Sequence, residues 1–315
     1  MSPVYSFGEV LIDMLPTDSG KFIPMAGGAP ANVAVAVAKL GGSSYFLGGL
    51  SSDNMGQLLK NELRANSVDT SFAAIKPNKT AIVLVTLDNE GERSFEFYRD
   101  NTADLAYNEQ DLAKVKWHKN GILHLCSNTL CTEQDHQLSL SAISQAKANE
   151  MTVSIDVNLR LNLWAKHEVP NLLERIEQVF QYTDIVKLSH EELDWLAQTK
   201  QVSTAKYLSY LISCDIKLVL ITDGSNDIRA IMQNGEQTVT PPQTAAVDTT
   251  GAGDSFIGGF LYQLANAASD VPRQTIFQQP ELIKEFVLFA SHCGAHTVTA
   301  KGAFAAMPTL SELKS

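Results

Sequence analysis

The sequence predicts an α/β fold with an open, mostly parallel sheet and a small β flap. Segments typical of buried strands alternate with helical segments along most of the chain, which is typical of βαβ units. A two-stranded pattern interrupts this alternation near residue 71, and polar residues follow several of the strands. Ligands of such sheets bind at the carboxyl ends of the strands, so we expect the site at that edge.

The composition narrows the class of protein. With 315 residues, 44% of them apolar, the chain can form one domain over 1–315 with an ample core. A net charge of −11 disfavours nucleic acid and anionic lipid as partners. We see no basic leader and no apolar run near the roughly 18 residues that span a bilayer. Four cysteines without a CxxC pair indicate free thiols in the cytoplasm.

The first half of the chain is expected to carry the flap. "VYSFGEVLID" predicts one continuous buried strand that turns polar at Asp13, followed by a loop up to "AGGAPAN". Pro30 then begins an Ala/Val-rich helix. "SSYFLGGL" is expected to be a short strand, and "NMGQLLKNELRAN" a helix. "TAIVLVTL", "DNEG" and "ERSFEFYR" predict a hairpin. Segments near 13–25 and 71–104 should together form a lid.

The βα alternation resumes after the hairpin. "GILHLCS", "TVSIDV", "DIVKLS" and "IKLVLITDG" predict strands, the last followed by a hairpin that starts at "DIRAIMQ". Two helical stretches, 251–268 and about 280–296, close the chain. Asp13, Ser127, "DVNLR", "KLS", "TDG" and "DTTGAGD" all follow strands or precede a helix. We expect them to meet at one edge of the sheet.

The loop "DTTGAGD" has glycines before a helix but fits neither of two common phosphate-binding patterns. It lacks the GxxxxGK[ST] of a P-loop and the GxGxxG of a dinucleotide fold. The N–H groups of residues 251–254, at a helix N-terminus, would still form an anion hole. Asp254 could accept a proton from an attacking hydroxyl group there. It could equally be an ordinary helix N-cap.

Two separated motifs resemble the ribokinase-like, PfkB-type carbohydrate kinases. "GGAPANVAVAVAKLGG" is similar to their N-terminal signature, and "DTTGAGDSF" followed by "GGF" to their C-terminal signature. The resemblance extends from "GEVLIDM" to "VTAKGA", and "DVNLRLNLW" and "VKLSHEEL" are most like the bacterial fructokinase branch. It implies a three-layer αβα sandwich with a mostly parallel sheet and a small β-sheet lid.

The resemblance also implies roles for particular residues. Asp254 would be the general base, the N–H groups of Gly251, Ala252 and Gly253 the anion hole, and Arg160 a contact of the moving phosphate. Sugar contacts would be Asp13, Gly27, Gly28, Asn32, Phe97, Arg99 and Asp254. The hairpin with Arg99 could instead be a dimer edge, since lids of this family often pair between subunits.

The nucleotide and cation sites follow from the same resemblance. Contacts with ATP would come from Lys187, Ser189, Glu192, Thr222, Gly224, Gly253, His292, Cys293 and His296, with Glu192 holding Mg²⁺ through water. Ser189 replaces the Asn that is commoner in the family. A potassium site would use Asp248, Thr250, Thr297, Ala300 and Gly302. His292 and His296 at i, i+4 could also face a zinc ion, but no second ligand pair has zinc spacing.

The expected activity is transfer of the γ-phosphoryl group of MgATP to a sugar hydroxymethyl group, with fructose giving fructose 6-phosphate. Alternative acceptors are aminoimidazole riboside, ribose and 2-keto-3-deoxygluconate. An acidic sugar would need a cation such as Arg99, and a nucleoside-like one would need a stacking surface from Phe95, Phe97 or Tyr98. A non-catalytic sugar sensor on the same fold is a further alternative. A homodimer through the lid is the expected assembly.

Overall fold

The predicted mostly parallel sheet forms the centre of the molecule. The computed structural model describes residues 1–17, 19–87, 93–164, 167–268 and 273–314. The main sheet has the strand order β14-β13-β12-β11-β10-β9-β1-β4. From β4 to β12 neighbouring strands are parallel, and β13 and β14 add an antiparallel edge. These strands are β1 Val4–Phe7, β4 Ser44–Leu47, β9 Ile122–Cys126, β10 Thr152–Asp156, β11 Ile185–Ser189, β12 Leu218–Thr222, β13 Ile228–Met232 and β14 Gly235–Val239.

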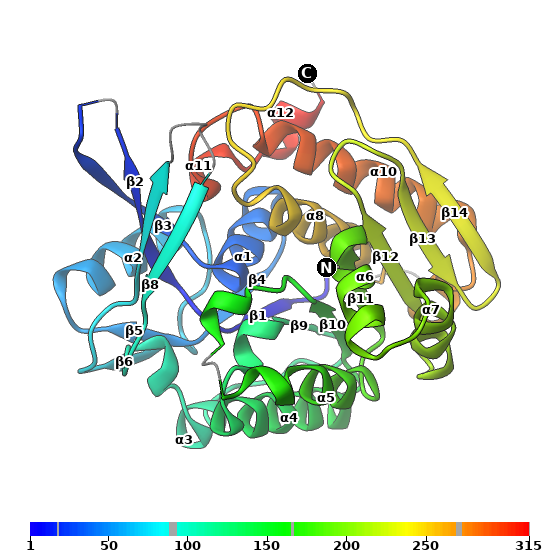
Figure 1. The fold of residues 1–315 in the computed structure, drawn as a ribbon, viewed down its shortest axis with the longest axis horizontal. Coiled ribbons are helices and arrows are strands. Elements are labelled where there is room, and N and C mark those ends of the chain that lie inside the picture. Colours follow the sequence, from blue (N-terminus) through cyan, green and yellow to red (C-terminus); the bar gives the residue numbers. More distant parts are fainter. Residues whose placement is uncertain (18, 88–92, 165–166, 269–272, 315) are drawn as a thin grey trace.

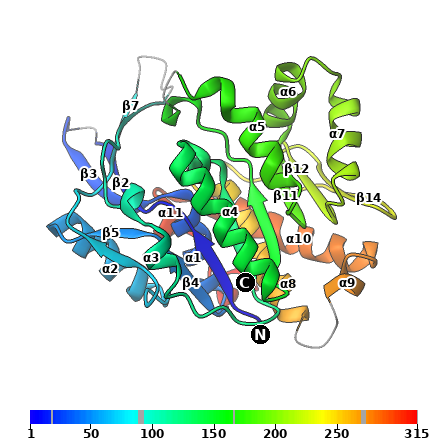
Figure 2. The same ribbon diagram turned by 90° about the horizontal axis from the view of Figure 1, so that it is seen from below.

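Helices cover both faces of this sheet, as Figures 1 and 2 show. Successive strand residues point to opposite faces of the sheet, so the strands are apolar on both faces. Leu123 packs in the core beneath α4 to α7, whereas Ile122 packs in the core beneath α1, α8 and α10. The helices are α1 Ala29–Lys39, α2 Asn54–Ala65, α3 Glu109–Leu112, α4 Glu133–Ala148, α5 Val169–Phe180, α6 His190–Thr199, α7 Thr204–Ser213, α8 Ala252–Ala267, α9 Arg273–Ile276, α10 Pro280–Thr297, α11 Ala303–Ala306 and α12 Leu310–Leu313.

A second sheet of four strands, here called the lid, lies at one side of the main sheet (Figure 1). Its order is β3-β2-β7-β8, and it draws strands from both segments that the sequence indicated. The predicted hairpin is antiparallel, with Val83 opposite Phe97, and its turn at 88–92 lies outside the described residues. Its strands are β2 Leu11–Pro16, β3 Phe22–Gly27, β7 Ile82–Leu87 and β8 Arg93–Tyr98; a third small sheet pairs β5 Gly49–Ser51 with β6 Ala74–Lys76.

Two sequence expectations for the first 50 residues are wrong. "VYSFGEVLID" is not one strand, because the chain breaks at Gly8 and continues as β2 in the lid. Gly8 has φ +145°, and a Cβ there would lie 2.6 Å from Cγ of Pro30. "SSYFLGGL" divides likewise at Gly48, where a Cβ would lie 2.2 Å from the carbonyl oxygen of Gly8. The expected loop before "AGGAPAN" also contains strand β3. The backbones at Gly8 and Gly48 approach each other too closely for side chains, and at both points the chain leaves the main sheet.

Helix α8 packs between α1 and α10 through two consecutive glycines. A Cβ on Gly258 would lie 2.5 Å from Cβ of Ala36 on α1, and one on Gly259 would lie 2.7 Å from Sγ of Cys293 on α10. Ala36 and Gly258 each lie one helical turn beyond a residue of the candidate site, Asn32 and Asp254. The close approach therefore fixes how α1 and α8 present those two side chains. No described helix is long and apolar enough to cross a membrane.

Gly258→Ala should lower the free energy of unfolding by about 1–3 kcal/mol, because the added methyl group overpacks the α1–α8 contact. Ala36→Gly removes the opposing methyl group and should recover part of that loss in the double variant, although alone it costs about 1 kcal/mol of helix propensity. Urea unfolding of the four proteins measures this coupling. Strictly additive effects would contradict the contact.

Candidate active site

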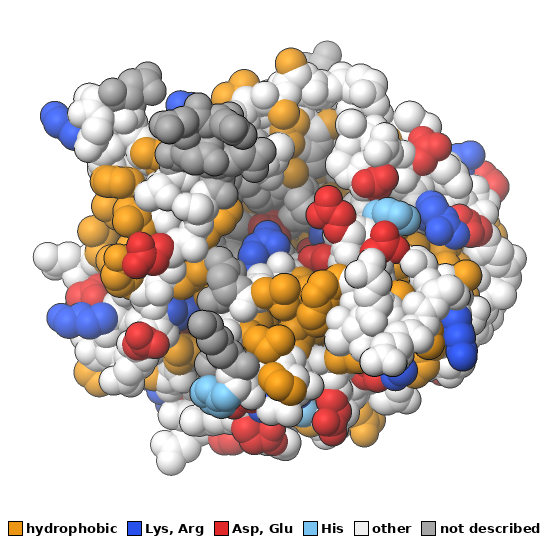
Figure 3. All heavy atoms as spheres, in the orientation of Figure 1, with side chains coloured by type: hydrophobic (Ala, Val, Ile, Leu, Met, Phe, Trp, Pro, Cys, Tyr) orange, Lys and Arg blue, Asp and Glu red, His pale blue; other side chains and the backbone are white. Residues whose placement is uncertain are grey.

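Strand ends and a helix start meet where the site was predicted. Asp156, Ser189 and Thr222 are the last residues of three neighbouring parallel strands, β10, β11 and β12. The first turn of α8 comes to the same edge, since a Cβ on Gly253 would lie 3.0 Å from Nζ of Lys187. Figure 3 shows a hollow on this face of the molecule, in which acidic and basic side chains gather.

The loop before α8 has the backbone conformation that an anion hole needs. Gly251 is the N-cap residue, with φ +77°, and a Cβ there would lie 2.9 Å from Cβ of Ala303. The helix begins without a side-chain cap. The N–H of Ala252 donates to the carbonyl oxygen of Thr249 at 3.3 Å, so the N–H groups that follow it are the better placed donors. A left-handed turn into a helix N-terminus attracts an anion.

Asp254 is buried in the first turn of α8, and its carboxylate is held by two amides from other elements. Asn32 Nδ2 donates to one oxygen at 2.7 Å, and Asn158 Nδ2 donates to the other at 3.3 Å. The alternative of a simple helix cap does not fit, since these bonds leave the helix. Burial raises the pKa of Asp254, while the bond from Asn32 and the charges of Lys187 and Arg160 lower it. A carboxylate with a raised pKa is a better proton acceptor.

Asp13, Gly27, Gly28 and Asn32 are brought together beside Asp254. A Cβ on Gly27 would lie 2.2 Å from Oδ2 of Asp13, so only glycine leaves room for that carboxyl group. Gly28 has φ +109°. Burial, and then the negative charges of Asp254 and Asp248, raise the pKa of Asp13 to about 7. The Oδ1 atom of Asn32 is buried without a hydrogen-bond partner among the described residues. These groups present acceptors to a ligand rich in hydroxyl groups.

Lys187 lies behind the loop in a buried ion pair. Its Nζ donates to both carboxylate oxygens of Asp156, at 2.8 and 3.0 Å. Burial raises the pKa of Asp156 to about 7, against the lowering effect of Lys187. Because Nζ also approaches Gly253, the ammonium adds positive charge to the anion hole from inside the protein.

Ser189 and Glu192 form a capping box at the start of α6. One oxygen of Glu192 accepts from the N–H of Ser189 at 2.7 Å, and the other accepts from the N–H of Leu159 at 2.6 Å. Glu192 therefore ties the end of β11 to the "DVNLR" segment. A carboxylate has about four lone-pair sites, so both oxygens keep the capacity to accept from a water molecule.

Arg160, Thr222 and Gly224 lie at the same edge of the sheet. The Arg160 side chain is exposed, its Nη1 donates to the carbonyl oxygen of Leu159 at 3.1 Å, and its charge acts on Asp254. Gly224, in the turn after β12, has φ +55°, and a Cβ there would meet open space. A bulky ligand could therefore approach this turn closely.

The positions expected to bind potassium are drawn together around Asp248, which is buried. Its carboxylate accepts from the N–H of Thr250 at 2.8 Å and from the N–H of Gly302 at 3.2 Å. Its own N–H donates to the carbonyl oxygen of Val298. Thr297 is buried beside this contact and Ala300 is exposed on the connecting turn. The loop before α8 and the segment after α10 thus form one unit.

The three residues of the expected adenine wall lie on α10, where the carbonyl oxygen of Cys293 accepts from Oγ of Ser255 in the first turn of α8 at 3.1 Å. Cys293 is buried between α8 and α10 against Gly259. His292 is exposed in an outer groove that Tyr262 and Leu310 also line. His296 Nδ1 donates to the carbonyl oxygen of Ala306 at 3.2 Å. In the part of the chain that the structure describes, no three His, Cys, Asp or Glu side chains form a group suited to a metal, so the zinc alternative gains no support.

Two lid residues expected to touch sugar have other partners in the structure. Phe97 packs against the apolar cluster of Leu11 and Val83 within the lid. The side chain of Arg99 is 10% exposed, and its Nε donates to Oδ2 of Asp104 at 2.6 Å. Neither contacts Asp13, Asn32 or Asp254 through any bond found among the described residues.

Sequence reasoning missed three residues of the site. Asn158 holds Asp254 and has φ +38°, an uncommon value that asparagine tolerates better than most residues. Asp156 holds Lys187, and both Asp156 and Asn158 lie in the "DVNLR" motif from which only Arg160 was selected. Glu9, in "GEVLID", is 2% exposed and accepts from the N–H of Ala29. The sequence signal for Glu9 was an acidic residue within an apolar segment, because a buried acid needs hydrogen-bond partners.

Asp13→Asn should raise the melting temperature more at pH 8 than at pH 5. The folded protein keeps the Asp13 proton up to about pH 7, well above its ordinary pKa of 3.8, so ionising it in the folded state costs stability that grows with pH. Asp53 is the matched control, because its pKa is lowered to about 2 by bonds from Gly56 and Thr80 despite burial. Asp53→Asn should destabilise the protein equally at both pH values. Equal effects of Asp13→Asn at the two pH values would contradict the assignment.

Comparison with known proteins shows the family of this chain. A family model described as pfkB family carbohydrate kinase matches residues 1–310. A curated protein from Arabidopsis thaliana, probable fructokinase-6, chloroplastic, is 39% identical over 314 residues, which cover 97% of this chain and 80% of that protein. A fructokinase from Xylella fastidiosa with bound ATP is 36% identical, with a TM-score of 0.91 over 99% of this chain and 97% of that one.

A second solved structure adds ligands to the comparison. It is a double mutant of the fructokinase from Vibrio cholerae O395 with fructose, ADP and potassium ion bound. It is 34% identical to this chain, with a TM-score of 0.90, and the match covers all of this chain and 97% of that one. The ribokinase-like fold and the mostly parallel sheet are therefore confirmed, and the chain belongs to the pfkB family of carbohydrate kinases.

Proposed function

We propose that this carbohydrate kinase is a fructokinase, which transfers the γ-phosphoryl group of MgATP to the 6-hydroxyl of fructose. The observation that carries the proposal is the Asp254 carboxylate, buried between Asn32 and Asn158 at the N-terminus of α8. The same turn offers a base for the hydroxyl group and N–H donors for the phosphoryl group. The identity of 34–39% to fructokinases of three organisms supports fructose as the acceptor.

Asp13 and Asn32 would orient the sugar so that its hydroxymethyl group faces Asp254. Asp254 takes the hydroxyl proton as the oxygen bonds to the γ-phosphorus, and the bond from that phosphorus to the bridging oxygen of ADP breaks. The helix N-terminus, Lys187 and Arg160 stabilise the charge on the transferring group. Each group is fixed before the reaction: Asp254 by two amides and Lys187 by Asp156.

The residues proposed to hold Mg²⁺ and K⁺ are compatible with these roles. Bound Mg²⁺ and K⁺ would neutralise phosphate charge and add positive field beside the loop. Glu192 has both oxygens bonded to backbone N–H groups, which suits a contact with magnesium through water better than direct ligation. Asp248 holds the two segments whose carbonyl groups would supply the oxygen ligands of potassium.

The lid would exclude water from the acceptor position, because water there would hydrolyse ATP. Asp13 lies on lid strand β2, so the sugar would contact the lid directly. Large apolar side chains on the lid strands remain exposed, namely Phe22, Ile23, Phe95 and Tyr98. They support the proposal that lids of two copies pair.

The alternative acceptors fit the structure less well. 2-Keto-3-deoxygluconate would need a cation, and Arg99 is already paired with Asp104 inside the protein. Of the candidates to stack on aminoimidazole riboside, Phe97 packs within the lid, whereas Phe95 and Tyr98 are exposed, so the sugar panel below must decide this acceptor. A non-catalytic sensor would not require Asp254 and the anion hole to be preserved together.

A panel of sugars tests the acceptor. With MgATP and coupled detection of ADP, we expect kcat/KM for fructose to exceed that for ribose, aminoimidazole riboside and 2-keto-3-deoxygluconate by at least about tenfold, as one missing polar contact commonly costs. Phosphate should be found on the 6-hydroxyl by NMR. A higher kcat/KM for any other member of the panel would overturn fructose as the acceptor.

A further inference from the structure

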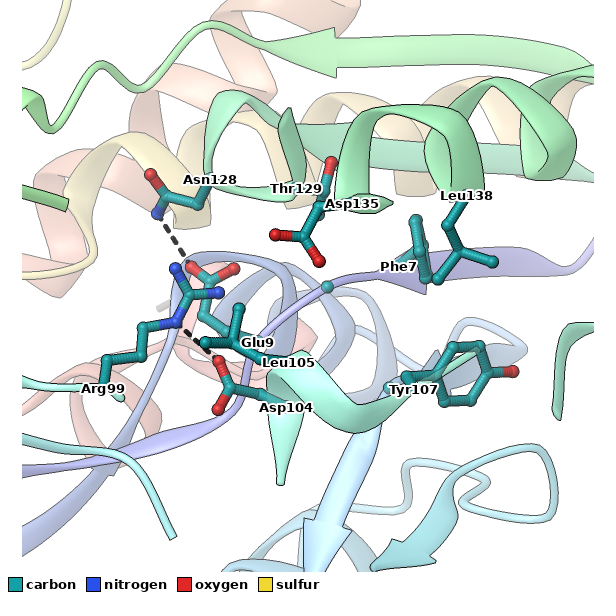
Figure 4. Close-up of a pocket in the computed structure, with 12 residues that line it drawn as sticks. Phe7, Glu9, Arg99, Asp104, Leu105, Tyr107, Asn128, Thr129, Asp135 and Leu138 are labelled. Carbon is teal, nitrogen blue, oxygen red and sulfur yellow. Dashed lines mark hydrogen bonds and ion pairs between the residues drawn. The ribbon is translucent and has the colours of Figure 1, made fainter. Parts of the chain in front are cut away.

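A small cavity beside the candidate site contains charges that the proposed reaction does not use. Its volume is about 20 Å³, and it lies where the lid meets the main sheet. Figure 4 shows that Glu9, Arg99, Asp104, Asn128 and Asp135 line it. Three acids thus face one guanidinium group in a space that ligands of the kinase reaction are too large to enter.

The polar groups of this cavity are incompletely satisfied. Asp104 Oδ1 and Asn128 Oδ1 are buried and have no hydrogen-bond partner among the described residues. Among the described residues, the hydrogen-bond donor to Glu9 Oε2 is a weak one, Sγ of Cys126 at 3.9 Å. A buried oxygen without a donor costs about 1–3 kcal/mol. A volume of about 10–15 Å³ is enough for one water molecule, which could donate to two of these oxygens and accept from Arg99.

Glu9 connects the cavity to the start of α1. Its Oε1 accepts from Asn128 Nδ2 at 2.9 Å and from the N–H of Ala29, the first residue of α1, at 3.3 Å. Its backbone oxygen lies directly beneath Gly28, 2.7 Å from where a Cβ would be. Asn32 follows one turn later and donates its N–H to the carbonyl oxygen of Gly28. A shift of Glu9 would therefore move the sugar-facing side of α1.

Arg99 connects the same cavity to the lid strand that carries Asp13. It directly follows β8, in which Phe97 lies opposite Val83 of β7. Val83 lies in turn opposite Asp13 of β2. The guanidinium is bonded to Asp104, acts electrostatically on Glu9, and points into the cavity in Figure 4.

We propose that Arg99 and Glu9 are positioning residues for the sugar, joined by one water molecule that the cavity binds, and that neither touches the sugar. Through them the lid strand with Asp13 is held at a fixed distance from the helix with Asn32. The kinetic part of this inference rests on the proposed function, whereas the bound water does not.

The test compares Arg99→Lys, Glu9→Gln and the double variant with the wild type. Lysine lacks the planar fork that bonds Asp104 and reaches the cavity, and glutamine removes the charge of Glu9 at constant size. Each single variant should raise KM for the sugar about 10- to 100-fold, the effect of one lost charge-assisted bond, with a much smaller change in kcat. The KM of the double variant should not exceed the higher of the two single-variant KM values. Arg229→Lys, which alters an exposed ion pair with Glu236, is the matched control and should leave KM unchanged.

Two results would overturn the inference. If Arg99→Lys raises KM and Glu9→Gln does not, or if their effects multiply, Arg99 acts on the sugar directly. If a high-resolution crystal structure of the wild type shows no water that bonds both Arg99 and Glu9 in this cavity, the coupling is absent; this arm does not depend on the variants folding. If the sugar panel selects another acceptor, only the proposed acceptor fails, and the same KM comparison is made with that sugar.

Discussion

The burial of the Asp254 carboxylate at the first turn of α8 is the constraint on which the rest of the site depends. A carboxylate without water must be given donors, and Asn32 and Asn158 supply them from α1 and from the loop after β10. These bonds require α1, α8 and β10 to meet at one point. Gly258 permits the necessary approach of the two helices, and the parallel strands bring the loop to their edge.

The groups around the Asp254 carboxylate have opposite effects on its pKa. Burial raises the pKa of both Asp13 and Asp254, and the negative charge of Asp254 raises the pKa of Asp13 further. Lys187 and Arg160 act in the other direction, and Asp156 keeps Lys187 in place behind Gly253. Two ionised carboxylates are therefore unfavourable in the empty site. Hydroxyl groups of a sugar would donate to them, and the phosphoryl group would lie near the positive charges. This electrostatic strain is the expected cost of a preorganised site.

The sequence predicted the parts of this molecule that local patterns control. The alternation of strands and helices, the hairpin, and the helices at 251–268 and 280–296 agree with the structure because each has its own periodicity and end signals. The breaks at Gly8 and Gly48 were missed because they arise from contact between distant backbones. The same limit applies to the site. Motifs indicated Asp254, Asp13 and Asn32, but no motif indicates the pairing of Arg99 with Asp104, which depends on how the chain turns after β8.

The most direct test of the central claim is the turnover of Asp254→Asn, which keeps the shape of the side chain and removes its basicity. If Asp254 accepts the hydroxyl proton, kcat should fall by roughly 10²–10⁴-fold. Fructose and ATP should still bind, as calorimetric titration can show, because the anion hole and Asp13 remain. A variant that binds both substrates and retains most of the wild-type kcat would contradict the claim.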